Sequence, residues 1–518
     1  MEEEYSLDDP TRLVESASEF AYYPGPLTDA AAKDFLDRFP LPLIINALQT
    51  KADFPGLENA IVTCLERVFK TKYGSSFIPQ YMSFVHVGLQ AESQVVRSLA
   101  CKTVTNLLEN LDDKSIPPIK LIIDYNIYPL LLDSLVTGNE QVAAAAIDAI
   151  KCIAGFPEGM AVVFPANNKE VTYLGNLASR SSSLGRVRVL SLIVKLFSIS
   201  KSVASVIYNS NLLSLLEAEI SNSEDTLVTL SVLELLFELA EIQHSTEFLS
   251  RTTLLQLLSS IISNTSTEAI LRSRAMMISG RLLSKENGFM FVDGSTIDRL
   301  LAQSESQDND ECESALEALG QIGSSIQGAE LLLSGFLPVV RHVVHAAFDR
   351  QGHGKQLAAL HALGNIVGES RPENSKILNA DAEENLRRLI YEVGSDSSKL
   401  TPSGLFLSIL QQASEFRLAG YRVITGLVAR PWCLMEICSK QDIINMVTDP
   451  TAETTKIGME ARHNCCKAIH NAFLSSKLIN ESSLSGIAAN LQEAVRRGPY
   501  LARKQSEAQP VVMTAERF

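Results

Sequence analysis

The most restrictive feature of this sequence is an apolar helical pattern that returns along the chain at a nearly constant interval. In its clearest copy, between Val142 and Ile153, apolar residues recur every three or four positions, which places them on one face of an α-helix. Gly155 is expected to end this helix, and Pro157 prevents its continuation. Each copy has one register residue near the end of its helix: Val68, Leu107, Ile153, Phe197, Leu239, Leu283, Ile322, Ile366, Leu427 and Ala472.

The register residues are spaced by 39, 46, 44, 42, 44, 39, 44, 61 and 45 residues. A period of about 40–47 residues is typical of armadillo and HEAT repeats, in which each unit buries its apolar face against the next. The residue seven positions earlier is also apolar or small in every copy: Ile61, Ala100, Ala146, Leu190, Val232, Met276, Ala315, Ala359, Gly420 and Cys465. We therefore predict an all-α fold, a right-handed armadillo/HEAT-like α-solenoid of about ten helical repeats.

The same pattern divides the chain into regions. Residues 1–25 are expected to form an acidic N-terminal segment with a short helix, and residues 26–502 to form the solenoid. The spacing of 61 residues indicates an insertion near 380–405. Residues 503–518 lose the pattern and are polar, so we expect a disordered tail.

Composition narrows the range of ligands. The chain has 518 residues, 46% of them hydrophobic, and a net charge of −15. Binding to nucleic acid or to an anionic membrane needs clustered Lys and Arg, so neither is expected. The acidic N-terminus does not fit a signal peptide, and the eight cysteines lack paired spacing, which favours a reducing compartment. We expect a monomer in the cytoplasm, and in the nucleus as well.

The inner face of the predicted solenoid offers candidate binding residues. The residue just before each register residue should point into the concave groove, and Asn106, Asn365 and Asn471 occupy this position. They resemble the armadillo asparagine that hydrogen-bonds the backbone of an extended ligand. Nuclear-import adaptors place a tryptophan four residues earlier. This chain has other residues there: Lys102, His361 and Lys467. We predict that Asn106, His361 and Asn365 contact a partner; the alternative is that they are solvated surface residues.

Two acidic stripes are predicted on the same face. The first comprises Glu234, Glu238 and Glu241, which recur at helical spacing. The second, two repeats later, comprises Glu313, Glu317 and Gln321. An acidic patch on the concave face would attract a basic partner surface. The alternative is a charged face that only keeps the solenoid soluble.

No catalytic or metal-binding constellation is visible in the sequence. It contains no GxxxxGK[ST], GxSxG or HExxH motif. Four histidines lie within 20 residues, but a glycine-rich turn separates them and their spacing does not suit a metal site: His342, His345, His353 and His361. We therefore expect no enzymatic activity, no cofactor and no bound metal.

Four stretches, in this order, resemble one protein family. They are SESQDNDECESALEALGQIGSSIQGAELLL at 304–333, GYRVITGLVARPWCLMEI at 420–437, EARHNCCKAIHN at 460–471 and GPYLARKQSEAQPVV at 498–512. In the second stretch a long helix ends at the pair Pro431-Trp432. Together they resemble the 26S proteasome non-ATPase regulatory subunit five family, and the resemblance spans about 60–500.

This resemblance implies a helical-repeat chaperone for the base of the 26S proteasome regulatory particle. It implies binding to the C-terminal domain of one ATPase ring subunit during assembly, release from the finished particle, and no enzymatic activity. The alternative is an armadillo-type adaptor that binds linear peptides or signalling partners. The absence of tryptophan at positions 102, 361 and 467 argues against that alternative.

Overall fold

The computed structural model describes ten stretches of the chain: 10–50, 53–110, 117–165, 173–222, 225–285, 295–306, 308–350, 352–397, 401–476 and 484–500. These described residues form helices joined by short connections and contain no β-strand, which confirms the all-α solenoid prediction. Residues 1–9 of the acidic segment and the predicted tail at 503–518 lie outside the described residues. The chain divides into two compact units, Met1–Thr253 and Leu254–Phe518, called unit 1 and unit 2.

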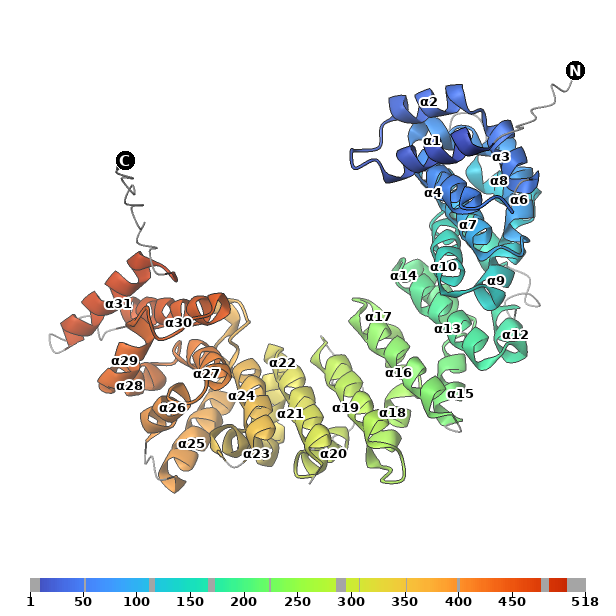
Figure 1. Ribbon diagram of the computed structural model, residues 1–518. Coiled ribbons are helices and arrows are strands. Elements are labelled where there is room, and N and C mark those ends of the chain that lie inside the picture. Colours follow the sequence, from blue (N-terminus) through green and yellow to red (C-terminus); the bar gives the residue numbers. More distant parts are fainter. Residues whose placement is uncertain are drawn as a thin grey trace, which may run out of the picture. The chain divides into compact units, whose positions relative to one another are not determined.

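Unit 1 is built from long helices that carry the register residues and shorter helices around them. The long helices are α4 (Leu57–Phe69), α7 (Gln94–Asn110), α10 (Glu140–Ala154), α13 (Ser183–Phe197) and α16 (Thr226–Glu241). The shorter ones are α1 (Thr11–Tyr22), α2 (Asp29–Arg38), α3 (Leu41–Thr50), α5 (Lys72–Ser75), η1 (Ile78–Tyr81), α6 (Met82–Leu89), α8 (Pro118–Asp124), α9 (Ile127–Thr137), α11 (Pro157–Val163), α12 (Tyr173–Arg180), α14 (Lys201–Asn209), α15 (Ser214–Ser221) and α17 (Ser245–Leu249). Each long helix packs against the next one, from α4 through α16 (Figure 1).

Unit 2 continues the same design. Its long helices are α19 (Ala269–Ser284), α21 (Asn309–Gly323), α24 (His353–Val367), α27 (Ser414–Leu427) and α30 (Lys456–Ser475). The shorter ones are α18 (Leu254–Ser263), α20 (Ser295–Ser304), α22 (Ile326–Gly335), α23 (Leu337–Phe348), η3 (Glu373–Ser375), α25 (Ala380–Asp396), α26 (Pro402–Leu410), α28 (Pro431–Ser439), α29 (Gln441–Thr448) and α31 (Ser485–Arg497). Figure 1 shows α19, α21, α24 and α27 side by side in chain order, and each contacts the next. The stretch predicted as an insertion contains α25, which packs against α22, α23 and α26.

Short polar side chains fix where several long helices begin. In each of them the side chain before the first turn accepts a hydrogen bond from a backbone N–H of that turn. These caps are Asn139 for α10, Ser182 for α13, Asp225 for α16, Asp308 for α21 and Thr455 for α30. Helix α24 differs, because it begins after Gly352 without a side-chain cap.

Within each unit, the seams between long helices are apolar and closely packed. Nine of the ten register residues are at most 2% exposed. The helices approach closely where glycine faces alanine: a Cβ atom added at Gly320 would lie 2.6 Å from the Cα atom of Ala362. A larger residue at position 320 would therefore force α21 and α24 apart.

Ala472 is the register residue that departs from this pattern. It is half-buried. The core side of α30 is formed instead by Cys465, Ile469 and Phe473, which are at most 1% exposed. Ala472 lines a hollow at the end of unit 2, so the seam between α27 and α30 is open at this point.

Two apolar helices of unit 2, α22 and α23, meet at a sharp bend of 102°. Together, these two helices have the length and the apolar composition of a membrane span. Within the described stretches, no single helix is both long enough and apolar enough to cross a membrane.

Candidate partner-binding surfaces

The first predicted acidic stripe is solvent-exposed. Glu234, Glu238 and Glu241 all lie on the exposed side of α16, and we call them the α16 stripe. Glu238 forms an ion pair with Lys195 of α13, with Nζ 2.6 Å from Oε2. Both side chains are at least 40% exposed, so water and salt weaken this pair. The stripe is therefore accessible to a partner.

Charge is divided unevenly between the two units. Unit 1 contains 31 acidic and 19 basic residues, whereas unit 2 contains 29 and 26. The region around the α16 stripe contributes to this imbalance, because residues 201–250 hold eight acidic residues and one basic residue. Unit 1 therefore carries most of the net negative charge, which would attract a basic surface.

The three members of the second stripe share α21 but have different surroundings. Glu313 is half-buried and its carboxylate lies against Gly354, since a Cβ atom added there would come within 1.7 Å of Oε1. Gly354 belongs to the first turn of α24, where a negative charge stabilises an uncapped helix end. Glu317 is exposed and Gln321 is half-buried. Glu313 is thus engaged within the fold, and Glu317 is the most accessible of the three.

Asn106 and Asn365 occupy equivalent repeat positions but differ in exposure. Asn106 on α7 is 6% exposed, so its amide offers little surface to a partner. Asn365 on α24 is half-buried, and its Oδ1 accepts a hydrogen bond of 3.1 Å from Nη2 of Arg422. The repeat pattern alone does not predict this difference in exposure.

Arg422 of α27 joins three side chains of the preceding repeat into one polar group, the Arg422 cluster. Besides Asn365, its Nη1 donates to Nδ1 of His361 at 2.9 Å, and Nη2 lies 3.1 Å from Oε2 of Glu369. Burial, and then the positive charge of Arg422, lower the pKa of His361, so its ring is neutral at pH 7 and accepts this bond. Arg422 and Glu369 lie 53 residues apart in neighbouring repeats, so no local pattern pointed to them.

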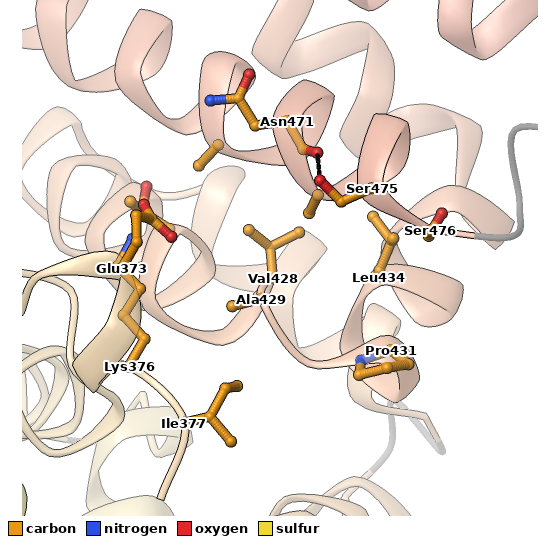
Figure 2. Close-up of a pocket in the computed structure, with 13 residues that line it drawn as sticks. Glu373, Lys376, Ile377, Val428, Ala429, Pro431, Leu434, Asn471, Ser475 and Ser476 are labelled. Atoms are coloured by element: carbon orange, nitrogen blue, oxygen red, sulfur yellow. Dashed lines mark hydrogen bonds and ion pairs between the residues drawn. The ribbon is translucent and has the colours of Figure 1, made fainter.

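A hollow of about 370 Å³ opens at the end of unit 2. It lies between α27, α28, α30 and the segment 373–377, and its floor is apolar: Val428, Ala429, Leu434, Ala468 and Ala472. Figure 2 shows Lys376 and Ile377 on one side of the hollow and Asn471 and Ser475 at the opposite edge. Sequence reasoning did not find this hollow, although it noted Asn471.

The cysteines show no sign of reactivity. Cys152 is half-buried and the other seven are buried. Burial raises the pKa of Cys152, Cys438 and Cys466 to about 11, so these thiols stay protonated and weakly nucleophilic at neutral pH. Among the described residues, no three or more His, Cys, Asp or Glu side chains are grouped to hold a metal ion.

Comparison with known proteins places this geometry in a family context. The sequence profile of a family described as proteasome non-ATPase 26S subunit matches residues 46–515. The chain is similar to the 26S proteasome non-ATPase regulatory subunit 5 of Bos taurus, with 22% identity over 423 residues, which cover 80% of this chain and 79% of that protein. The subunit of the same name from Homo sapiens is 23% identical over 378 residues, 71% of each chain.

The Mus musculus protein of the same name is 20% identical over 438 residues, 83% of this chain and 81% of that protein. Among solved structures, the crystal structure of an engineered protein is similar with a TM-score of 0.43 and 15% identity. That similarity covers 80% of this chain and 99% of the engineered one.

Proposed function

Because this chain belongs to the proteasome non-ATPase 26S subunit family, we propose that it is a non-catalytic chaperone for assembly of the base of the 26S proteasome regulatory particle. In this proposal it binds the C-terminal domain of one ATPase ring subunit and leaves the finished particle. Its relatives are named regulatory subunits of the 26S proteasome, which supports an association with that particle.

The α16 stripe is the observation that carries the binding part of this proposal. Three exposed carboxylates lie on one helix of a unit with a strong excess of acidic residues. Complementary charge speeds encounter with a basic surface and disfavours acidic competitors. We propose that Glu317 and the Arg422 cluster are further contacts, made by unit 2.

We also propose that the chain acts as a monomer in the cytoplasm and the nucleus. The buried, unpaired cysteines are compatible with a reducing compartment, where thiols stay free. A stacked array with exposed long-helix faces suits a protein that grips a folded partner domain.

The test is a pull-down of separately purified base ATPase subunits by the full-length chain. One subunit should be recovered preferentially, and its isolated C-terminal domain should suffice. Replacing Glu234 and Glu238 by Lys should weaken this binding by about tenfold at low salt, with a smaller effect at high salt.

A matched control keeps the change in net charge but moves it elsewhere on unit 1. Glu92 and Asp124 are both exposed and lie outside α16, so replacing both by Lys should leave binding nearly unchanged. Equal loss in both double variants would assign the effect to overall charge. Recovery of no subunit at all would reject the proposed function.

A further inference from the structure

The hollow at the end of unit 2 is an unfilled seam. The other register residues of unit 2, Leu283, Ile322, Ile366 and Leu427, are at most 2% exposed. At Ala472 the neighbouring side chains leave about 370 Å³ open above an apolar floor. A dry apolar cavity of about 150 Å³ already admits benzene, so this hollow has room for one aliphatic side chain and adjoining main chain.

The walls of the hollow are held at a fixed separation. Arg430 is 1% exposed and donates to the carbonyl of Gly426 at 2.9 Å, at the end of α27. The same guanidinium donates to the carbonyl of Lys376 at 3.1 Å, on the opposite wall. One buried side chain therefore ties both walls together, and the hollow is formed before any ligand enters.

The rim offers the polar groups that a peptide main chain needs. Asn471 is exposed on α30, and in the described part of the chain its side-chain amide makes no hydrogen bond. An amide side chain presents one acceptor and two donors, which match the N–H and C=O groups of an extended peptide. Ser475 does not compete for these groups, because its hydroxyl donates to the carbonyl of Asn471 at 3.0 Å.

Charge at the rim is asymmetric. Glu373 is 86% exposed, although its Oε1 lies 2.7 Å from Nζ of the buried Lys376. Its outward side is open to a second cation. Among the residues that line the hollow, Glu373 is the one charged side chain that is exposed. A basic residue of a ligand is therefore directed toward Glu373.

We infer that this hollow binds an extended peptide segment of a partner protein, with an aliphatic side chain on the apolar floor and a neighbouring Lys or Arg beside Glu373. Asn471 holds the main chain between these two points. The inference rests on the proposed function only in assuming a protein partner, and it adds a linear segment to the folded domain proposed above.

Disulfide tethering on the full-length chain tests this directly. Ser475→Cys introduces a thiol at the rim, against a background in which only Cys152 is not buried. The probes are mixed disulfides of cysteamine that carry acetyl-Lys-Leu, acetyl-Lys-Ser or 4-methylpentanoyl groups. Under partial reduction, intact-protein mass spectrometry should show acetyl-Lys-Leu captured about fivefold more than either other probe.

Two further variants decide the outcome. Leu474→Cys places a thiol on the neighbouring exposed residue, which does not line the hollow, and should show no preference among probes. Ala472→Leu fills the hollow and, combined with Ser475→Cys, should abolish the preference. A preference that survives Ala472→Leu, or that also occurs at Leu474→Cys, overturns the inference. Equal capture of the 4-methylpentanoyl probe overturns its peptide part.

The two proposals fail separately. Selective tethering without recovery of any ATPase subunit in the pull-down rejects the proposed function and keeps the peptide site. Recovery of one subunit without selective tethering rejects the peptide site alone.

Discussion

Arg430 and Glu383 form a two-point ion pair inside unit 2, with Nε 2.7 Å from Oε2 and Nη2 2.9 Å from Oε1. Glu383 lies near the start of α25 and is 47 residues away in sequence. Further N–H groups of Arg430 donate to carbonyls at the ends of α24 and α27 and in the segment before α25. One guanidinium therefore connects four places in two adjacent repeats.

Arg430→Met should destabilise these repeats by several kcal/mol, because the half-buried Glu383 loses its ion pair and three backbone carbonyls lose a donor. Amide hydrogen exchange in α24 and α27 is the suitable measurement, since it reports the local free energy of opening. The control is Arg387→Met, because the pair of Arg387 with Glu384 is exposed and should contribute less than about 1 kcal/mol. Similar exchange in both variants would show that the buried pair contributes little.

Ile150→Asp should destabilise the seam between α10 and its neighbours by several kcal/mol, because Ile150 is fully buried and the new carboxylate has no partner there. Ala144→Asp, on the exposed side of the same helix, should cost less than about 1 kcal/mol. Thermal unfolding followed by circular dichroism compares the two. A parental melting curve for Ile150→Asp would mean that this seam is not closed in solution.

The burial of Ile150 and the paths of the long helices could be predicted from sequence, because helical periodicity is local and the repeat spacing sets the stacking order. The polar contacts between repeats could not. Arg422 and His361 are 61 residues apart in sequence. Their contact depends on the length of the connection between α24 and α27. Ala472 was placed in a closed seam by the same periodicity that placed Ile150 correctly. Whether a seam is closed depends on the side chains that the neighbouring segments place over it. At Ala472 these side chains leave a hollow open.

Exposure at the candidate site was equally hard to predict. Asn106 and Asn365 have the same place in the repeat, yet only Asn365 keeps part of its surface. Glu313 has the spacing of an exposed stripe, but its carboxylate packs against Gly354. That glycine lies 41 residues further along the chain, at the uncapped start of α24. Such contacts depend on the relative rotation and translation of adjacent helices. A hydrophobic pattern identifies the buried face of each helix but does not specify these two quantities.

Asp225→Ala should destabilise α16 by about 1 kcal/mol, because two backbone N–H groups of its first turn lose their acceptor. Asp225→Asn keeps an acceptor and should cost only a fraction of that. Hydrogen exchange at the start of α16 should be faster in Asp225→Ala than in the parent chain. Binding of this variant to a partner that is present at saturating concentration should be unchanged. Equal exchange in the two variants would contradict the capping role.

The Arg422 cluster predicts a dependence of stability on pH. His361 accepts a hydrogen bond from Arg422, and burial and that charge hold its pKa below the ordinary value of 6.5. Between the two values, the unfolded chain binds a proton that the folded chain does not, so stability falls as the pH drops below about 6.5. His361→Gln retains a hydrogen-bond acceptor but cannot titrate, so it should lose less stability over this interval.

The free energy of opening of α24 and α27, measured by hydrogen exchange between pH 7.5 and 5.5, gives the difference between the two chains. His342 and His463, whose pKa values are also lowered by burial, are present in both chains and cancel in the comparison. Parallel pH profiles would mean that His361 titrates alike in the folded and unfolded chain, and would remove the neutral imidazole from the cluster.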